Sequence, residues 1–348
     1  MSEKSFQTNL AKSKEVAAEI DKNPSKFRML TGDRPTGYLH IGHYFGSIKN
    51  RVELQNKGVE TIVLIADYQV ITDRDTTENI EEYVYNMLAD YLACGIDPKK
   101  TKIFAHSAVP ALNQLMLPFL SCVSEAELLR NPTVKTEMKA SGHELTGLLL
   151  TYPVHQACDI LFCKADIVPV GKDQMPHIEQ TRLIARRFNN RYGKVFKEPV
   201  GLLSEAIEVP GLDGRKMSKS YKNAISLGLT ADETASLIKK SQTDSDRNIT
   251  YDPKKRKGVS ALLTTAALCS GRTPEDIAAE IGDGGGGALK ATTTEAVNSF
   301  LEPIRKKRTE YLKDKAQLKA ILDEGNAYAN DIANQTLDEV RKAMCMSY

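Results

Sequence analysis

Two short motifs, far apart in the chain, carry residue types suited to handling a triphosphate. The first is His40-Ile41-Gly42-His43, and the second is the lysine-rich segment Lys216–Ser220. A triphosphate binds backbone N–H groups and the positive end of a helix dipole. It also binds cationic side chains, whose attraction to the phosphates becomes stronger as negative charge develops on the departing pyrophosphate. The pair predicts adenylyl transfer from ATP, in which the catalytic side chains are His40, His43, Lys216 and Lys219.

Each motif also has a simpler interpretation. His40 could only cap a helix while His43 packs in a core, and the lysine segment could be an exposed basic loop. Pro35-Thr36-Gly37 precedes the histidines, and the hinge-rich stretch 208–214 precedes the lysines. The turn before the histidines, together with the presence of both motifs in one chain, favours the chemical interpretation of both.

A polar stripe is expected on a helix between residues 145 and 163. Tyr152, Gln156 and Asp159 recur at i, i+4 and i+7 among apolar neighbours, which puts them on one face. A carboxylate on an apolar helix needs a polar partner. That partner could be an indole N–H or a phenol of a substrate. A salt bridge to Lys164 or a bond to another helix is the structural alternative.

Polar residues also follow two expected strands. Gly171-Lys172-Asp173-Gln174 comes after the strand 166–170, and Asp67-Tyr68-Gln69 comes after the strand 61–66. Asp173 and Gln174 could bind ribose hydroxyls or a substrate amine, while Gly171 permits close approach. Such residues can equally be ordinary loop formers.

These segments need a scaffold of alternating strands and helices. Apolar runs predict strands at 27–31, 61–66, 102–105 and 166–170, and helical periodicity predicts helices at 41–55 and from Ile80 to the stop at Gly95. The alternation predicts an α/β fold, a Rossmann-like doubly wound parallel sheet. Ligands of such sheets collect at the carboxyl ends of strands, which is where the turn 32–37 delivers the two histidines.

The chain divides by pattern into an extension and two domains. Residues 1–26 are expected to form a polar, peripheral helical extension, and residues 27–227 the catalytic domain with a helical insertion at about 107–163. Residues 228–348 show only helical patterns and are expected to form a smaller all-α domain whose last helix packs back on the catalytic domain. The run Gly284–Gly287 lacks a following Lys-Ser/Thr and is expected to be a flexible connector.

Composition limits the class of protein. The 348 residues carry a net charge of +2, with 41% hydrophobic and 26% charged residues, as in an ordinary globular protein. The basic runs 254–257 and 305–308 are the only obvious candidates for a polyanion site. Six cysteines without a CxxC pair argue against zinc ribbons and iron–sulfur clusters. With no apparent secretory signal or membrane-length apolar stretch, a cytoplasmic enzyme without a resident metal is expected.

These residues resemble a known family. The segment Thr31–His43, the helix around Tyr152–Asp159, the block Val168–Gln174 and the loop Lys216–Ser220 are similar to class I aminoacyl-tRNA synthetases, most closely the bacterial tryptophanyl-tRNA synthetases. The resemblance extends into the helical half, for example at 243–246 and 289–290, and covers nearly everything after Phe27. Gln69 and Gln156 depart from many relatives, which have His and an apolar residue there.

The resemblance implies a role for each matching position. The implied ATP site consists of Arg34, Pro35, Thr36, Gly42, His43, Gly171, Lys172, Asp173, Val209, Lys216, Met217, Ser218, Lys219 and Ser220. The implied amino-acid site consists of Gly32, Gln69, Tyr152, Gln156, Asp159 and Gln174, with Asp159 receiving the indole N–H.

The implied reaction is ATP-dependent activation of L-tryptophan to tryptophanyl-adenylate, assisted by Mg²⁺, and transfer to the 3′ end of tRNA(Trp), releasing AMP and pyrophosphate. The implied partners are tRNA, bound at its anticodon by residues 228–348, and a second copy docked through the helices at 112–139; no membrane or DNA is expected. Tyrosine–tRNA ligation is the nearest alternative. A small-molecule adenylyltransferase or a non-catalytic RNA-binding module are the remote ones.

Overall fold

A parallel sheet organises the catalytic half of the molecule. The computed structural model describes residues 3–72, 77–141, 145–203, 209–218 and 221–348. Within these residues, five parallel strands form one sheet in the order β3-β2-β1-β4-β5. The strands are β1 (Arg28–Asp33), β2 (Glu60–Ile65), β3 (Thr101–Ala105), β4 (Ile167–Val170) and β5 (Val200–Leu203). The Rossmann-like α/β fold predicted from the sequence is confirmed, with β5 as a strand that the sequence analysis missed.

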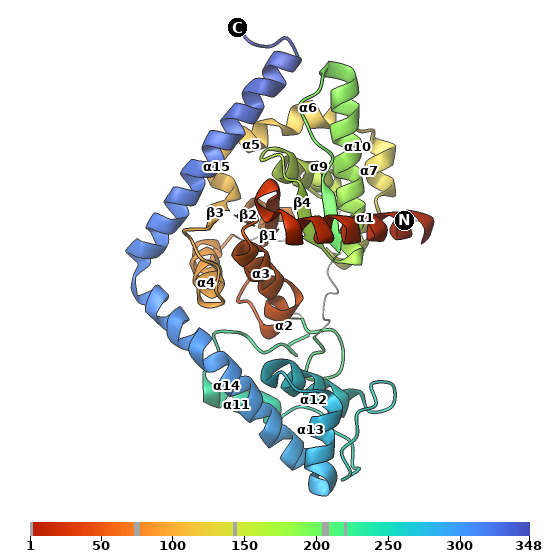
Figure 1. The fold of residues 1–348 in the computed structure, drawn as a ribbon, viewed down its shortest axis with the longest axis vertical. Helices are drawn as coiled ribbons and strands as arrows, with labels where there is room; N and C mark the ends of the chain where they lie inside the picture. Colours follow the sequence, from red (N-terminus) through yellow and green to blue (C-terminus); the bar gives the residue numbers. More distant parts are fainter. Residues whose placement is uncertain (1–2, 73–76, 142–144, 204–208, 219–220) are drawn as a thin grey trace.

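Helices cover both faces of this sheet, and a helical cluster lies below it (Figure 1). The helices of the first half are α1 (Glu3–Lys22), α2 (Ile41–His43), α3 (Lys49–Lys57), α4 (Ile80–Ala93), α5 (Pro110–Gln114), α6 (Met116–Leu120), α7 (Glu125–Arg130), α8 (Pro132–Ser141), α9 (Gly147–Leu161) and α10 (Met175–Tyr192). The second half contains α11 (Ala231–Lys239), α12 (Lys257–Ser270), α13 (Pro274–Ile281), α14 (Gly285–Lys313) and α15 (Lys315–Ala343). Within the described residues no helix combines the length and apolar character needed to cross a membrane.

Alternating side chains of the strands feed separate cores on the two faces. Val63 and Ile65 of β2 belong to a buried cluster that also contains residues of α4, α12 and α14. Ile62 and Leu64 point to the opposite face and belong to a second cluster, with residues of α5, α9 and α10. This alternation follows from the two-residue repeat of a strand, and burial on both faces explains why Ile62–Ile65 of β2 are all apolar.

Helix α1 is not peripheral, contrary to the expectation from its polarity. Its buried face comprises Asn9, Ser13, Val16 and Ile20, at helical spacing. Val16 and Ile20 pack in a small core with Met29 and neighbouring strand residues. Asn9 and Ser13 interrupt the apolar periodicity of this face, so the sequence does not show it as a buried one. Both can be buried because a polar group is tolerated in the interior when it has a hydrogen-bond partner.

Helix α15 closes the open edge of the sheet at β3. The Asn326 side chain accepts a bond from the Ala105 N–H at 2.9 Å. A β-carbon on Gly325 would lie 1.8 Å from the carbonyl oxygen of Ile103, so only glycine allows this approach. The contact covers an edge that would otherwise present unpaired backbone groups.

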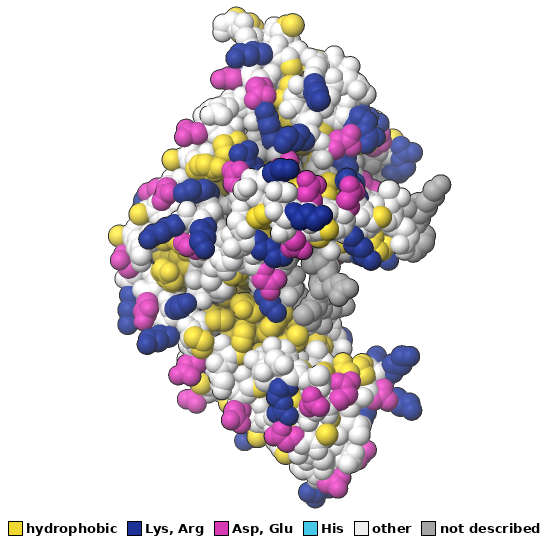
Figure 2. Space-filling model, in the orientation of Figure 1, with side chains coloured by type: hydrophobic (Ala, Val, Ile, Leu, Met, Phe, Trp, Pro, Cys, Tyr) yellow, Lys and Arg dark blue, Asp and Glu magenta, His cyan; other side chains and the backbone are white. Residues whose placement is uncertain are grey.

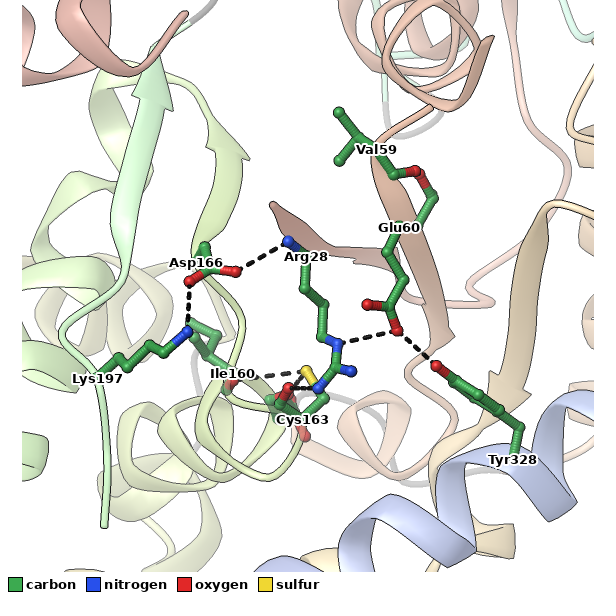
Figure 3. Close-up of polar contacts among 10 residues, drawn as sticks. Arg28, Val59, Glu60, Ile160, Cys163, Asp166, Lys197 and Tyr328 are labelled. Atoms are coloured by element: carbon green, nitrogen blue, oxygen red, sulfur yellow. Dashed lines mark hydrogen bonds and ion pairs between the residues drawn. The ribbon is translucent and has the colours of Figure 1, made fainter. Parts of the chain in front are cut away.

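A polar network joins the amino ends of three strands to α15 (Figure 3). The Arg28 backbone N–H of β1 donates to Asp166, just before β4, at 2.9 Å. The Arg28 guanidinium pairs with Glu60 of β2 at 3.0 Å, and the Tyr328 hydroxyl of α15 donates to the same Glu60 carboxylate at 2.5 Å. The network lies at the edge opposite the strands' carboxyl ends and therefore leaves those ends available for ligands.

The glycine run is ordered, which corrects the expectation of a flexible connector. Gly282–Gly284 form a 3₁₀ turn, and the following glycines begin α14. The Gly285 N–H donates to the Arg247 carbonyl at 3.0 Å, and the Asn248 side chain donates to Asp283 at 2.9 Å. Tertiary hydrogen bonds hold a segment whose composition alone favours disorder.

Arginines of both basic runs are used within the fold. Arg256 makes two bonds to the Asp244 carboxylate, at 2.8 and 2.5 Å. Arg308 of α14 pairs with the buried Asp90 of α4 at 2.6 Å. Figure 2 shows acidic and basic side chains interspersed over the face in view. The runs are therefore partly structural, as charged runs commonly are.

Candidate active site

A cavity of about 850 Å³ opens at the carboxyl ends of β1 and β4. It brings together ten of the residues proposed from the sequence: Gly32, Arg34, Gln69, Tyr152, Gln156, Asp159, Gly171, Lys172, Asp173 and Gln174. Helix α9 supplies the polar stripe, and its first turn is capped by the Thr146 hydroxyl, which accepts from the Leu149 N–H at 3.1 Å. The volume lies in the range of cofactor and small-molecule sites.

One pole of the cavity is built around the buried carboxylate of Asp159. The Gln69 side-chain amide donates to one Asp159 oxygen at 3.1 Å, and His106 Nε2 lies 2.8 Å from the other. Burial disfavours the charged imidazole, but the Asp159 carboxylate outweighs it and raises the pKa of His106. Lys164, the structural alternative from the sequence, instead pairs with Glu339 at 2.6 Å.

The histidines beside Asp159 were missed by the sequence analysis. The His155 ring stacks on His106, with centroids 4.2 Å apart, and its Nε2 lies 2.7 Å from Asn113 Oδ1. Burial lowers the pKa of His155. His106 directly follows the expected strand 102–105, so its position at a strand's carboxyl end was the available signal.

An aromatic wall flanks this pole. The Tyr152 hydroxyl donates to the Thr133 hydroxyl at 2.8 Å, and burial raises the pKa of Tyr152. The His177 ring lies 5.5 Å from the Tyr152 ring, centroid to centroid. Burial lowers the pKa of His177 to about 4, so this imidazole is neutral at physiological pH.

The turn between β4 and α10 forms a second pole of the cavity. Lys172–Gln174 form a single 3₁₀ turn, after which α10 begins at Met175. The Gln174 amide donates to Asp173 at 3.1 Å, and the Lys172 ammonium lies 4.5 Å from the centre of the Phe6 ring of α1. A helix start beside a cationic side chain suits an anionic or hydroxyl-rich ligand.

The two-histidine motif begins the short helix α2. His40 is the residue before the helix, and its backbone N–H donates to His43 Nδ1 at 3.1 Å. With Nδ1 accepting, the neutral His43 ring carries its proton on Nε2, which is then a donor. The imidazole centroids are 3.7 Å apart. The expected helix 41–55 is present as α2, a π-helical turn at Tyr44–Ile48 and α3.

The lysine loop lies against this motif. A β-carbon on Gly42 would be 3.4 Å from Met217 Sδ and 2.9 Å from the His40 ring. The Ile41 N–H donates to the Ile225 carbonyl at 3.0 Å, and the Leu227 N–H donates to Leu39 at 2.9 Å. Residues from opposite ends of the catalytic half therefore meet at the start of α2.

Asn223, which the sequence did not single out, organises the loop. Its side-chain oxygen accepts from the Ser218 N–H at 2.8 Å, and its amide donates to Asp213 at 2.7 Å and to the Lys216 carbonyl at 3.1 Å. Val209 accepts from the Met217 N–H at 3.3 Å. Lys216 is exposed, and the remaining proposed members, Lys219 and Ser220, lie outside the described residues.

The motifs adjoin the cavity rather than line it. Pro35, Thr36, His40, Gly42, His43, Val209, Lys216, Met217 and Ser218 are not among its lining residues. Asp33 connects the motifs to the cavity. This residue lines the cavity, and His43 is one of the groups that lower the pKa of its carboxyl.

Asp33 is held by a buried pair that the sequence analysis missed. Burial would raise the pKa of its carboxyl, but the Arg51 guanidinium outweighs burial and keeps the pKa below its usual range. Arg51 Nη1 and the Tyr91 hydroxyl each lie 2.6 Å from Asp33 Oδ2. Since Arg51 is on α3 and Tyr91 on α4, the network fixes the end of β1 against both helices.

Comparison with known proteins agrees with this geometry. Residues 22–302 match the family model of class I tRNA synthetases (W and Y). The tryptophan–tRNA ligase of Clostridium longisporum is 42% identical over 331 residues, covering 92% of this chain and 97% of that protein. That of Streptococcus pneumoniae is 44% identical over 338 residues, with 92% and 98% covered.

Solved structures give the same result. The tryptophanyl-tRNA synthetase of Campylobacter jejuni, complexed with ADP and tryptophan, superposes with a TM-score of 0.82 at 32% identity and covers 91% of this chain and 99% of that one. A tyrosyl-tRNA synthetase of Archaeoglobus fulgidus shares the fold, with a TM-score of 0.65 at 22% identity. The chain belongs to the class I tRNA synthetases of the tryptophan and tyrosine group.

Proposed function

We propose that this enzyme activates L-tryptophan with ATP and transfers the tryptophanyl group to the 3′ end of tRNA(Trp), releasing pyrophosphate and AMP. The observation that carries the proposal is one cavity lined both by a buried acceptor, Asp159, and by the Gly171–Gln174 turn. The family membership and the tryptophan–tRNA ligases that match over most of their length support the same reaction.

The Asp159 pole suits an indole. An indole N–H can only donate, and an ionised carboxylate has about four acceptor sites, of which Gln69 uses one, while His106 Nε2 lies 2.8 Å from the other oxygen. A phenol could use the same acceptor, so Asp159 alone does not exclude tyrosine. The tryptophan-specific relatives favour tryptophan over the tyrosine alternative.

In the proposed first step, the amino-acid carboxylate attacks the α-phosphorus of ATP in line with departing pyrophosphate. The carboxylate is already nucleophilic, so the protein contributes position and charge stabilisation. Gly171, Lys172 and Asp173 bind the nucleoside part, and Gln174 lies near the amino acid. His43 donates from Nε2 to phosphate, while Lys216 and Lys219 bind most strongly to the departing pyrophosphate. The relative solved with ADP and tryptophan supports nucleotide binding.

Mg²⁺ is proposed to enter on the ATP phosphates. Among the described residues, the group able to converge on a metal is His106, His155 and Asp159, and two imidazoles do not suit an ion that prefers six oxygen ligands. The Asp33 carboxylate is already held by Arg51. We therefore assign the chain no resident Mg²⁺ site and derive no step through the metal.

The second step and the partners complete the proposal. Residues 228–348 would read the anticodon, since single-stranded RNA loops are recognised by base stacking and base-edge contacts. The helices at 112–139 would form a homodimer interface, on which Leu117 is 77% exposed and Leu129 and Met138 are also exposed. Unpaired cysteines throughout the chain favour a cytoplasmic enzyme.

Amino-acid-dependent exchange of pyrophosphate into ATP tests the proposal. We expect exchange with tryptophan and at least a hundredfold less with tyrosine. Asp159→Asn should raise the KM for tryptophan by about 10- to 100-fold, since a hydrogen bond to a charged group contributes about 1.5–3 kcal/mol. Lys219→Ala should lower kcat more than it raises either KM. Exchange that favours tyrosine, or that survives Asp159→Asn unchanged, would refute the assignment.

A further inference from the structure

Helix α1 contributes a side chain to the cavity although it lies outside the matched family region. The family match begins at residue 22, where α1 ends. The Phe6 ring is part of the cavity lining and faces the Lys172 ammonium at 4.5 Å from the ring centre. Lys172 belongs to the turn that carries the nucleoside pole of the proposed site.

The site end of α1 is fixed to α10, the helix that follows that turn. The Ser5 hydroxyl and the Asn9 amide both donate to Glu179, at 2.7 and 3.2 Å. Arg182 donates to the Asn9 side-chain oxygen at 2.6 Å. Asn9 is buried, so these bonds hold α1 and α10 in one register near Phe6.

The middle of α1 is fixed to the sheet. The Ser13 hydroxyl accepts from the Leu203 N–H of β5 at 2.8 Å. Val16 and Ile20 are buried against Met29 and Ile167. The helix is thus anchored along its length by its own buried face, and Phe6 occupies a defined position at the cavity.

We propose that Phe6 is a positioning residue for ATP, acting through Lys172. This rests on the proposed function. Ordering a lysine side chain costs rotamer entropy, and an aromatic face within about 6 Å attracts its ammonium. The ring holds Lys172 at the nucleoside pole, so that less of this entropy remains to be lost when ATP binds. The N-terminal helix therefore tunes nucleotide affinity without touching the amino-acid pole around Asp159.

Steady-state exchange kinetics test the role. Phe6→Ala should raise the KM for ATP about fivefold, leaving kcat and the KM for tryptophan within twofold of wild type. Phe6→Tyr should restore the wild-type KM because it keeps the aromatic face, and Phe6→Leu should not. Lys12→Ala, on an exposed part of α1, is the matched control and should change none of these constants. The rescue by Tyr and not by Leu separates positioning from simple packing.

A cycle with Lys172→Met tests the route through the lysine. If Phe6 acts through Lys172, Phe6→Ala should have no further effect on the KM for ATP in a Lys172→Met background. The chain contains no tryptophan, so Phe6→Trp also creates a single indole at the site. Its fluorescence should change on titration with ATP alone, without catalysis.

The outcomes separate this inference from the function on which it rests. A wild-type enzyme without tryptophan-dependent exchange would refute the proposed function, whereas a Phe6→Trp signal that ATP still changes would leave the placement of Phe6 supported. Wild-type exchange together with an unchanged KM for ATP in Phe6→Ala would refute the inference alone. An equal loss in the Phe6→Tyr and Phe6→Ala variants would also overturn it.

Discussion

The buried pair between Arg51 and Asp33 allows a quantitative prediction at the edge of the site. Replacing Arg51 by Met keeps most of the side-chain volume but removes the positive charge 2.6 Å from the Asp33 oxygen. Two unit charges about 4 Å apart attract by about 4 kcal/mol at an effective dielectric constant near 20. Removing one partner of a buried ion pair lowers the free energy of unfolding by about 3–5 kcal/mol.

The lower end of that range applies here. The Asp33 side chain is 22% exposed, so water can partly solvate the orphaned carboxylate. We expect Arg51→Met to reduce the free energy of unfolding by about 3 kcal/mol, or about 1 M in the urea midpoint for a chain of this size. Lys57→Met is the control on the same helix. Its partner Asp21 and the lysine itself are half exposed, and such pairs contribute under about 1 kcal/mol.

The pH dependence identifies the cause. In the wild type the pKa of Asp33 is lowered by Arg51, so the stabilisation is present above the ordinary carboxyl pKa and is lost as pH falls below it. In Arg51→Met, burial without the cation raises that pKa, so protonation relieves the defect in mild acid. The stability gap between the two proteins should narrow from pH 8 toward pH 5. A gap that is constant over this range, or smaller than that of Lys57→Met, would refute the electrostatic explanation.

Three further predictions concern His177 of the aromatic wall, the lysine loop and the sheet edge at β3. Burial lowers the pKa of His177 to about 4, so the folded protein binds a proton there less readily than the unfolded chain. The free energy of unfolding of the wild type should therefore fall by about 3 kcal/mol as pH drops from 6.5 to 4. Urea unfolding of His177→Asn should lack that part of the decline, and a pH profile identical to that of the wild type would contradict the argument. Asn223→Ala removes the hydrogen bonds that hold the loop near Lys216. It should lower kcat about tenfold in pyrophosphate exchange and leave the KM for tryptophan unchanged. A wild-type kcat would show that the loop is held in place without the Asn223 side chain. Gly325→Ala places a β-carbon against the Ile103 carbonyl and should lower the free energy of unfolding by about 1–3 kcal/mol. Hydrogen exchange of the β3 backbone amides should become faster. Unchanged exchange would mean that α15 accommodates the methyl group.

The catalytic scaffold was predictable from the sequence because its signals are local. The unbroken apolar run at 61–66 identifies a strand buried on both faces, and α9 carries its polar stripe at helical spacing. β5 was missed because its four residues, Val200–Leu203, include a glycine and follow Pro199, so that no continuous apolar run marks them. A strand of that length owes its existence to pairing with β4, which a local pattern does not contain.

The supporting residues of the site were missed for a related reason. Their roles depend on partners distant in sequence: His106 acts on Asp159, Arg51 on Asp33, and Phe6 on Lys172. Each has an ordinary local context, and only the fold brings it to its partner. The site residues proposed from sequence were those with a motif around them, whereas the residues that hold them have none.

The seat of α15 on β3 also has a consequence for biosynthesis. Ala329, Ala333 and Leu337 complete the same core as Phe104 and Phe162, more than two hundred residues after β3 leaves the ribosome. Until α15 has emerged, the nascent chain carries an uncovered strand edge and an incomplete core, the features that make intermediates prone to aggregate. During translation the catalytic half therefore keeps this edge uncovered until residues 315–343 have been made.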